Sequence, residues 1–590
     1  MKILFLTTAF NGLAQRAWIE LDRLNHQVKV QIASDAEAMV RATTEFQPEL
    51  IVAPFLKKKI PEQVWKNYRC LVVHPGIPGD RGASSLDWAI LNGEKEWGVS
   101  ILEAVEKMDA GAVWASAAFP MRAVSKACLY RHEVTQAAAK ALLTAIKNIQ
   151  TPGFRPTYPD DVRPDIRGRW NRSTQASDYR FEWTGNTADI LNKIRAADSD
   201  PGAPVQFFGE DYFAFGGHPE ERLTGPAGQI IARRDAAICV ATGDKALWLT
   251  HLKPDRDGAI KLPATLALGE KAAHIACDEL SPFEWMYFNA VSGRPTPDTF
   301  QEIRYREEKE TGYIWFDFYN GAMSTDQCRR LRQTIIDAKK RPVKVIVLMG
   351  GTDVWSNGIH LNVIEQAENP ADESWRNIQA IDDLILEIIE SPDHYVISAL
   401  QGNAGAGGVP LALAADKVLA RQGIVLNPHT KNMGLYGSEY WTYLLPQKIG
   451  IEKARQFTDE CLPWGTAVAK EIGLIDDVFG ETAAEFCAGV EQVARDIARL
   501  PYFDKLLQAK RFQRKKDERI KPLAQYRAAE LERMRVNFYE NDAGYDEKRF
   551  RFVHKIYDPR QEQTLEDRDW YSSRRKIYRR RKWESVEYGQ

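Results

Sequence analysis

A histidine and an aspartate near the amino terminus have the residue types and spacing for acid–base chemistry. His74 directly follows the apolar run CLVV and precedes the Pro-Gly-rich segment PGIPGDRG. Asp109 follows a second apolar run, in a turn with Gly111. We expect His74 to be exposed at the carboxyl end of a strand, where a general acid or base is placed, and Asp109 to orient its imidazole. A structural histidine in a tight turn is the alternative.

Two glycine-rich segments further along the chain could stabilise an oxyanion. In the first, a strand and a glycine turn lead into a helix that begins after Gly358, Ile359 and His360. In the second, the run GNAGAGG, which ends in Gly407 and Gly408, joins a strand to a helix. Each helix start carries amide N–H groups without a helical partner, so a pair of them can form an oxyanion hole. A glycine run alone could instead allow close packing or bind phosphate.

The segment PHTKNMGLYGSEYWTYLL supplies a third candidate group. It contains Glu439, with Tyr436 and His429 close in sequence. A carboxylate here could take a proton from a substrate. The alternative is that Glu439 lies on a helix beside Tyr440 and Trp441 as a surface or salt-bridging residue. The histidines show no HExxH or HxH spacing, so the sequence predicts no metal site.

The patterns around these groups predict an α/β multidomain protein. Short runs rich in Val, Ile and Leu alternate with stretches of 3.6-residue apolar spacing, which is typical of a mostly parallel sheet covered by helices. Ligands of such sheets bind beyond the carboxyl ends of the strands. The predicted segments are a Rossmann-like domain (1–150), a linker with a small β-rich, OB-like module (151–265), a connector containing Pro282, Pro295 and Pro297 (266–304), a second α/β domain (305–500) and a basic helical region (501–590).

Composition narrows the function classes further. The formal charge of −2 gives no global attraction to nucleic acid or membranes, and no apolar stretch approaches the roughly 20 residues of a membrane helix. The seven cysteines are scattered and form no CxxC pair, which predicts reduced thiols and a cytoplasmic location. Residues 501–590 hold 24 Lys and Arg against 16 Asp and Glu. This excess could form a solvated face or a basic clamp for phosphates or a protein partner.

The stretch 70–115 resembles the folate-dependent formyltransferases, a family that includes the methionyl-tRNA and phosphoribosylglycinamide enzymes. The matching motifs, in order, are His74, Arg81-Gly82-Ala83, Gly98-Val99-Ser100 and Asp109-Ala110-Gly111. The resemblance covers about 1–150 and extends over about 165–265, which is similar to the carboxyl-terminal domain of methionyl-tRNA formyltransferase. It implies that 10-formyltetrahydrofolate binds between the His74 loop and the loop of Pro54, Phe55 and Leu56, near Arg81 and Gly82.

One position departs from that family. Val72 stands where the formyltransferases have an asparagine, two residues before the histidine. The family assigns that amide to the formyl oxygen, and loss of one such donor can lower the rate by about two to three decades. Either this half is a non-catalytic folate binder, or its acceptor needs less help. A thiolate, which is a stronger nucleophile than a neutral amine, would fit the second option.

Residues 305–500 resemble the crotonase superfamily of enoyl-CoA hydratases and isomerases. The resemblance implies that the amides of Ile359 and Gly407 hold the thioester carbonyl of an acyl-CoA, and that Gly358 and Gly408 help to form the CoA site. The two glutamates that hydratases use align with Pro410 and a position near His429. Since proline cannot do acid–base work, hydration of an enoyl-CoA is not expected. Glu439, helped by Tyr436 or His429, is the expected base.

Formyl-CoA is the compound that a formyl-handling half and a CoA-thioester half have in common. The fusion of the two halves, together with the motif GLYGSEYW, resembles the HypX/HoxX family of hydrogenase maturation factors. That resemblance implies formyl transfer to coenzyme A and release of carbon monoxide for [NiFe]-hydrogenase, with hydrogenase maturation proteins as candidate partners. The alternatives are a formyltransferase acting on an amine or a tRNA with a separate acyl-CoA hydrolase or isomerase half, and a non-catalytic folate- and CoA-binding scaffold.

Overall fold

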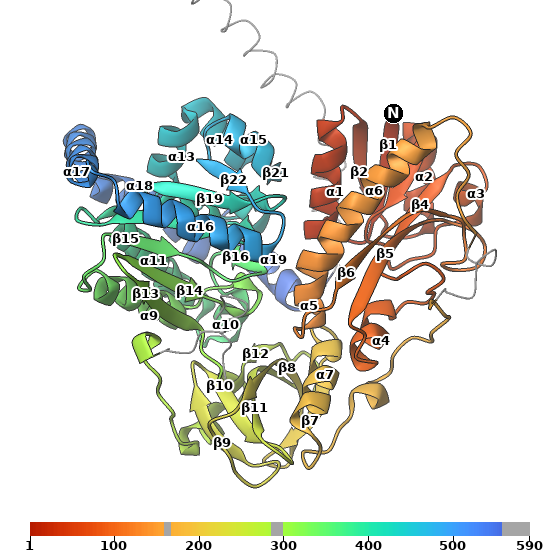
Figure 1. Ribbon diagram of the computed structural model, residues 1–590, viewed down its shortest axis with the longest axis horizontal. Helices are drawn as coiled ribbons and strands as arrows, with labels where there is room; N and C mark the ends of the chain where they lie inside the picture. The colour runs from red at the N-terminus through yellow and green to blue at the C-terminus, as the bar shows by residue number, and fades with distance from the viewer. Residues whose placement is uncertain (159–166, 285–298, 557–590) are drawn as a thin grey trace, which may run out of the picture. The chain divides into compact units, whose positions relative to one another are not determined.

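The computed structural model describes residues 1–158, 167–284 and 299–556 (Figure 1). Contacts among these residues divide them into two compact units, 1–175 and 176–556. The densest basic run of the sequence, 574–582, lies outside the described residues, as do Pro295 and Pro297 of the expected connector.

The first unit is built on one six-stranded sheet with the order β2-β1-β3-β4-β5-β6. β1 to β4 pair in parallel, and β5 and β6 complete the sheet in antiparallel pairs. The strands are β1 (Lys2–Thr7), β2 (Gln27–Ile32), β3 (Leu50–Ala53), β4 (Cys70–His74), β5 (Glu96–Glu103) and β6 (Val113–Pro120). The helices are α1 (Gly12–Arg23), α2 (Ala36–Phe46), α3 (Glu62–Trp65), α4 (Ser85–Leu91), α5 (Lys126–Leu129) and α6 (Thr135–Gln150).

Helices cover the sheet of the first unit because its strands are apolar on both faces. Leu4 and Leu6 of β1 pack with Met39 and Ala42 of α2. α1 and α6 lie side by side (Figure 1). The side chain of Asp35 caps α2 by accepting a hydrogen bond from the Ala38 amide at 2.7 Å. This scaffold fixes the carboxyl ends of β3 and β4, where the first candidate site lies.

The second unit begins with a small antiparallel module. Its strand order is β7-β8-β11-β10-β9, and β12 pairs with β11. The strands are β7 (Ala203–Phe207), β8 (Glu210–Glu220), β9 (Ile230–Arg234), β10 (Ala237–Ala241), β11 (Ala246–Pro254) and β12 (Leu262–Pro263). Helix α7 (Thr187–Ala197) packs on β8, and α8 (Ala264–Leu268) follows β12.

The rest of the second unit has two sheets. The larger has the order β13-β14-β15-β17-β19-β22, and the smaller has the order β16-β18-β20-β21. The larger sheet comprises β13 (Ile303–Glu308), β14 (Thr311–Phe316), β15 (Val345–Leu348), β17 (Tyr395–Leu400), β19 (Lys417–Arg421) and β22 (Asp477–Phe479). The smaller sheet comprises β16 (Val354–Ser356), β18 (Asn403–Gly405), β20 (Val425–Asn427) and β21 (Trp464–Gly465).

Helices surround these two sheets. The early ones are α9 (Thr325–Ala338), α10 (Leu361–Gln366), α11 (Pro370–Ile389), α12 (Gly408–Leu413), α13 (Trp441–Ile449), α14 (Ile451–Glu460) and α15 (Thr466–Glu471). The later ones are α16 (Ala483–Ala498), α17 (Phe503–Ile520), α18 (Leu523–Arg535) and α19 (Tyr545–Val553). α9 and α11 pack together (Figure 1). α16 covers one face of the larger sheet, where Phe486 and Val490 are buried against Val347 and Ile397.

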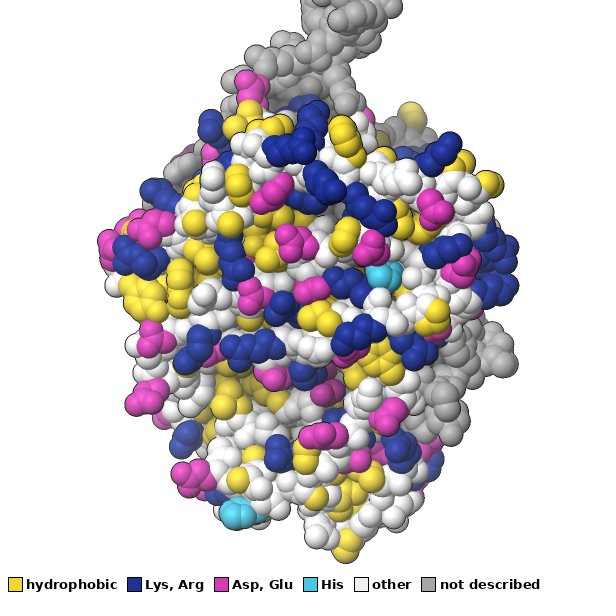
Figure 2. All heavy atoms as spheres, turned by 90° about the vertical axis from the view of Figure 1, so that its left-hand side faces the viewer, with side chains coloured by type: hydrophobic (Ala, Val, Ile, Leu, Met, Phe, Trp, Pro, Cys, Tyr) yellow, Lys and Arg dark blue, Asp and Glu magenta, His cyan; other side chains and the backbone are white. Residues whose placement is uncertain are grey.

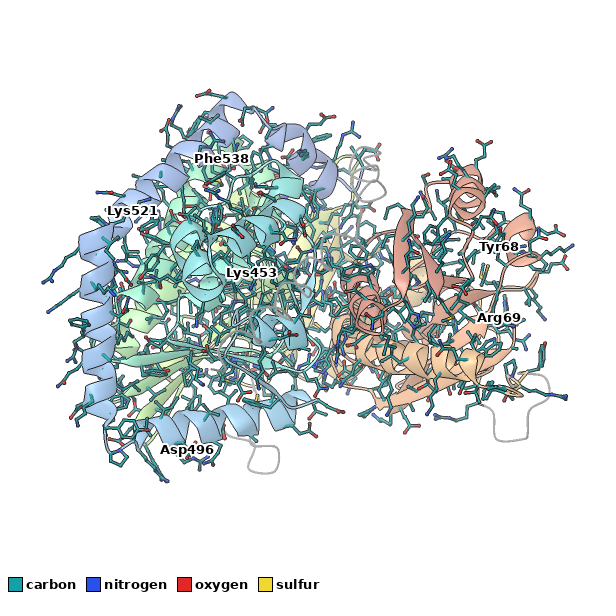
Figure 3. The ribbon with its side chains drawn as sticks, turned by 90° about the horizontal axis from the view of Figure 1, so that it is seen from above. Tyr68, Arg69, Lys453, Asp496, Lys521 and Phe538 are labelled. Carbon is teal, nitrogen blue, oxygen red and sulfur yellow. The ribbon has the colours of Figure 1, made fainter. Side chains whose placement is uncertain are left out.

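The helices after residue 500 fold onto this α/β domain. Met534, Phe538 and Tyr545 form one buried cluster with Ile378 of α11 and Leu435. α17 and α18 run along the edge of the second unit, with Lys521 where they meet (Figure 3). The described part of the basic region is therefore built into the second unit, and α18 reaches the neighbourhood of the second candidate site.

Charged side chains of both signs are interspersed on the side of the molecule shown in Figure 2. Two basic residues of α17 form ion pairs. Lys510 lies 2.6 Å from Asp416, and Arg511 lies 2.8 Å from Asp393. The Arg511 pair is exposed, as the solvated-face interpretation expects. The Lys510 pair is largely buried and belongs to the packed part of the second unit.

Candidate active sites

The first candidate site lies at the carboxyl end of β4. His74 is the last residue of that strand, and its Nε2 lies 2.9 Å from Oδ2 of Asp80. Its Nδ1 lies 3.7 Å from Oδ2 of Asp109. The expectation that His74 is exposed is wrong, because only 4 % of its surface is accessible. The loop folds back over the strand end, so the imidazole lies between two carboxylates.

Both carboxylates are held by the loops that the sequence brings together. The Asn171 side-chain amide donates to Oδ1 of Asp80 at 3.3 Å. The Gly82 amide donates to Oδ2 of Asp109 at 3.1 Å. Sequence reasoning selected Asp109 and missed Asp80, which is the nearer partner of the imidazole. Asp80 could have been identified from the sequence, because it lies six residues after His74 in the same Pro-Gly-rich loop.

The loop after β3 provides the expected neighbouring wall. Pro54 is buried, while Phe55 and Leu56 are half-buried. The Phe55 carbonyl accepts hydrogen bonds from the Thr8 amide at 2.7 Å and the Thr7 hydroxyl at 2.9 Å, which ties this loop to the end of β1. The carboxyl ends of β1, β3 and β4 thus meet at one edge of the sheet, as ligand sites in α/β sheets require.

The turn after His74 is anchored by a later segment. The Arg81 amide donates to the Arg169 carbonyl at 3.1 Å, and the Asn171 amide donates to the Arg81 carbonyl at 2.9 Å. Arg81 and Gly82 are both half-buried. Residues 167–175 therefore belong to the first unit and pack against the His74 loop.

Val72 lies two residues before His74 on β4 and so shares its face of the strand. Its side chain is partly buried against the cluster that contains Leu4, Leu6 and Ile51. A hydrocarbon at this position cannot donate a hydrogen bond to a formyl oxygen.

The second candidate site lies in the second unit, where two helix starts face each other. Ile359 precedes α10, and Gly407 precedes α12. Gly358 has φ +75°, and a Cβ on it would lie 3.1 Å from the Gly407 nitrogen, so the close approach of the two backbones requires glycine. Among the described residues, neither the Ile359 amide nor the Gly407 amide donates a hydrogen bond to the protein. Gly408 begins α12, and its carbonyl accepts from the Trp355 indole at 3.0 Å.

Glu439 lies directly against this pair of amides. A Cβ on Gly407 would collide with Oε1 of Glu439, so the carboxyl occupies the space beside the Gly407 Cα. Glu439 is not on a helix or on the surface, in contrast to the alternative considered from the sequence. It lies in a left-handed turn, with φ 63°, before α13, and only 3 % of its surface is accessible. Its Oε2 accepts the Ser438 amide at 2.8 Å.

Two further buried carboxyls surround Glu439. Asp382 of α11 accepts hydrogen bonds from the Glu439 amide at 2.8 Å and from the Ser438 hydroxyl. Glu530 of α18 accepts the Tyr440 amide at 2.9 Å. Burial raises the pKa of Glu439 to about 8, with a further contribution from the charge of Asp382. Burial likewise raises the pKa of Asp382 to about 7 and that of Glu530 to about 8.

Tyr436 and His429 precede Glu439 in the same segment, and among the described residues neither side chain forms a hydrogen bond with Glu439. The Tyr436 ring is 5.4 Å from the Trp441 ring, and its amide donates to Asn537 at 2.8 Å. Nδ1 of His429 donates to the Asn427 carbonyl at 2.8 Å, and burial lowers the pKa of His429. A neutral His429 of this tautomer leaves Nε2 as an acceptor.

The same helix start also explains Pro410. It lies in the first turn of α12, where a backbone N–H has no helical partner to lose. Its ring leaves no acid–base group at that position. Among the described residues, no group of three or more His, Cys, Asp and Glu side chains has a metal-binding arrangement. The described part of the chain also has no helix long and apolar enough to span a membrane.

Comparisons with known proteins match the two halves separately and together. The formyl transferase family model matches residues 15–146, the formyl transferase carboxyl-terminal domain model matches 174–267, and the enoyl-CoA hydratase/isomerase model matches 320–555. A methionyl-tRNA formyltransferase of Streptococcus equi subsp. equi is 29 % identical over 187 residues, which are 32 % of this chain and 58 % of that protein.

Two relatives align over nearly the full length. Hydrogenase maturation factor HoxX of Bradyrhizobium diazoefficiens is 42 % identical over 560 residues, which cover 94 % of this chain and 95 % of that protein. The crystal structure of HypX from Aquifex aeolicus in complex with tetrahydrofolic acid is 44 % identical, with a TM-score of 0.90, and the match covers 97 % of this chain and 99 % of that one. With a formyltransferase domain, a crotonase-like domain and a full-length relative at this identity, the chain belongs to the HypX/HoxX family of hydrogenase maturation factors.

Proposed function

We propose that this protein transfers a formyl group from 10-formyltetrahydrofolate to coenzyme A and then releases carbon monoxide from formyl-CoA for the hydrogenase active site. The family membership supports a role in hydrogenase maturation, and the solved relative that contains tetrahydrofolic acid supports the folate. Other maturation proteins are the proposed partners. We also propose a cytoplasmic location, because the seven cysteines are scattered along the sequence and form no CxxC pair.

The first reaction exchanges one bond to the formyl carbon for another. The CoA sulfur attacks the formyl carbon, the bond from that carbon to N10 of the folate breaks, and the thiol proton ends on N10. His74 lies between two carboxylates, so it can carry this proton while the charge of its imidazolium is stabilised. The hydrocarbon at Val72 removes one donor for the oxyanion, which favours a thiolate over an amine as acceptor.

The second reaction converts formyl-CoA to carbon monoxide and free thiol. The Ile359 and Gly407 amides polarise the thioester carbonyl. Glu439 removes the formyl proton, the C–S bond breaks with its electron pair going to sulfur, and carbon monoxide leaves. The proton then passes from Glu439 to the thiolate, so the net change is formyl-CoA to CO and CoA. A base with a pKa near 8 suits proton transfer near neutral pH.

One observation carries this proposal: the carboxyl of Glu439 occupies the space at the Gly407 Cα, beside two amides that have no partner among the described residues. A formyl thioester has no α-carbon, so the enolate chemistry of crotonases is unavailable to it. The formyl hydrogen is the only hydrogen on the acyl carbon that a base next to the carbonyl-binding amides can remove. Tyr436 and His429 remain proposed helpers in this step.

The Glu439→Gln variant tests the proposal, because Gln keeps the shape and removes the base. Carbon monoxide release, followed with a haem-protein trap, should fall by about two to four decades, while tetrahydrofolate release in the presence of CoA continues. Chromatography should show formyl-CoA, or formate from its hydrolysis, in place of CO. Glu532→Gln on the exposed surface of α18 is the matched control. Normal CO yield from Glu439→Gln would exclude this mechanism.

A further inference from the structure

We propose that Asp382 and Glu530 are positioning residues. They hold the Glu439 turn against the oxyanion amides, and their negative charges favour the protonated form of Glu439. This inference rests on the proposed role of Glu439 as the base. It concerns two carboxyls that approach the turn from helices separate from it, α11 and α18.

The conformation of the turn needs external support. Glu439 and Tyr440 have φ values of 63° and 56°, in the left-handed region that is unfavourable for residues with a Cβ. Such a pair persists only where the surroundings hold it in place. Its backbone amides have no helical or sheet partner, so they must be satisfied in another way.

Asp382 and Glu530 satisfy the amides from two sides. Asp382 accepts the Glu439 amide at 2.8 Å and the Ser438 hydroxyl at 2.9 Å. Glu530 accepts the Tyr440 amide at 2.9 Å, the Thr442 amide at 2.8 Å and the Thr442 hydroxyl. Each carboxylate acts only as an acceptor, so the turn presents donors to both. This arrangement fixes the turn whose side chain lies at Gly407.

The two carboxyls also lie close to the base, and each places a negative charge beside it when it ionises. Asp382 is 0 % exposed and Glu530 is 1 % exposed. The cation beside them is Arg527 of α18, whose Nε lies 3.7 Å from Asp382. Its Nη1 lies 2.7 Å from Asp383, which is partly exposed.

Among the described residues, the other titratable groups that interact with the cluster are Cys328 of α9 and the Tyr440 phenol. Burial raises the pKa of both. Three neighbouring buried carboxyls cannot all ionise without strong repulsion, so a charge on Asp382 favours a proton on Glu439.

The test is the pH profile of CO release from formyl-CoA supplied directly, which bypasses the folate reaction. The rate should rise with pH as Glu439 ionises. Asp382→Asn removes a negative charge, and its amide oxygen can still accept from the Glu439 amide. The rising limb should therefore move to lower pH by on the order of one unit. Arg527→Gln removes the cation that favours the ionised form of Asp382, so Asp382 takes up a proton more readily and the limb should again move to lower pH. Asp383→Asn, next on the same helix and 43 % exposed, is the matched control and should move the limb much less.

Glu530→Gln tests the positioning role separately. Its NH2 group would face either the Thr442 donors or the Tyr440 amide, so the turn should shift and kcat should fall by on the order of 10²-fold. The KM for formyl-CoA should change little, because the amides that bind the carbonyl are intact.

Displacement of both limbs to lower pH, with a much smaller displacement in Asp383→Asn, supports the inference, since a purely structural role would not produce this pattern. If Asp382→Asn does not fold, the Arg527→Gln limb alone still decides, because an unshifted limb in that variant contradicts the inference. Profiles that coincide with the wild type, while Glu439→Gln has lost CO release, would overturn the inference and leave the proposed function standing. Retained CO release in Glu439→Gln would instead overturn the proposed function.

Discussion

Replacing Glu439 with Gln should stabilise the protein against unfolding, by an amount that grows with pH. The pKa of Glu439 is raised by burial from 4.5 to about 8. Below about pH 4.5 the carboxyl is protonated in the folded and unfolded chain alike, so the raised pKa has no destabilising effect there. As the pH rises from about 4.5 to about 8, the unfolded chain releases the proton before the folded chain does, and the wild type loses stability. Above about pH 8 the loss is complete. Gln has no proton to release.

The size of this effect follows from the pKa. A rise from 4.5 to about 8 corresponds to roughly 5 kcal/mol, at about 1.4 kcal/mol per pH unit. This is an upper limit, because Asp382 and Glu530 take part in the same proton equilibrium. Gln can still accept the Ser438 amide. We therefore expect the variant to gain about 2 to 5 kcal/mol relative to the wild type between pH 4.5 and pH 9.

Urea unfolding of the second unit, followed at several pH values between 4.5 and 9, measures the difference. Glu532→Gln is again the control, because that side chain is 66 % exposed. It should change the free energy of unfolding by less than about 0.5 kcal/mol at every pH. If the free energy of unfolding of Glu439→Gln, relative to the wild type, also does not change with pH, the conclusion that Glu439 is strongly desolvated in the folded protein is refuted.

Three further predictions concern the first site. His74→Ala should abolish tetrahydrofolate release in the presence of CoA, and it should also lower the melting temperature, because Asp80 would lose its partner in a buried place; unchanged release would exclude His74. Asp80→Asn should lower kcat for that release by at least about tenfold with a smaller change in KM, since the imidazole loses its nearer carboxylate; steady-state kinetics would show an equal effect on both constants if Asp80 only shapes the folate site. Val72→Asn should keep the thiol reaction and let amines compete as acceptors, which formylated products would reveal; an unchanged melting temperature with no amine product would contradict our interpretation of Val72.

The sequence predicted the central strands of both α/β domains, but not β6 or the short strands of the smaller sheet. The apolar runs before His74 and after Lys344 are long enough and sufficiently rich in Val, Ile and Leu to be recognised as buried strands. The glycines at 358 and 407 marked the two helix starts, because only such residues allow two backbones to approach closely. The contact between Glu439 and Gly407 joins segments about 30 residues apart, which local pattern does not predict.

The supporting carboxylates were missed because each looks like a surface charge on a helix. Asp382 nevertheless falls on the apolar stripe of its helix, four residues after Ile378 and three before Ile385. Glu530 falls on the stripe that also holds Leu523 and Met534. A charged residue within an apolar stripe was the available signal, since such a residue is buried only with partners. The identity of the partners depends on tertiary packing.

The dependence of the Glu439 turn on α18 has a consequence for the order in which the activities arise during synthesis. Glu530 is made 90 residues after Tyr440, whose amide it accepts. A nascent chain can fold its formyltransferase domain first, as domains generally fold in order from the amino terminus. Until α18 is made, the Tyr440 and Thr442 amides lack their acceptor. On the proposed function, the growing chain can bind folate before it can release a toxic gas, and CO production begins only in a chain completed through α18.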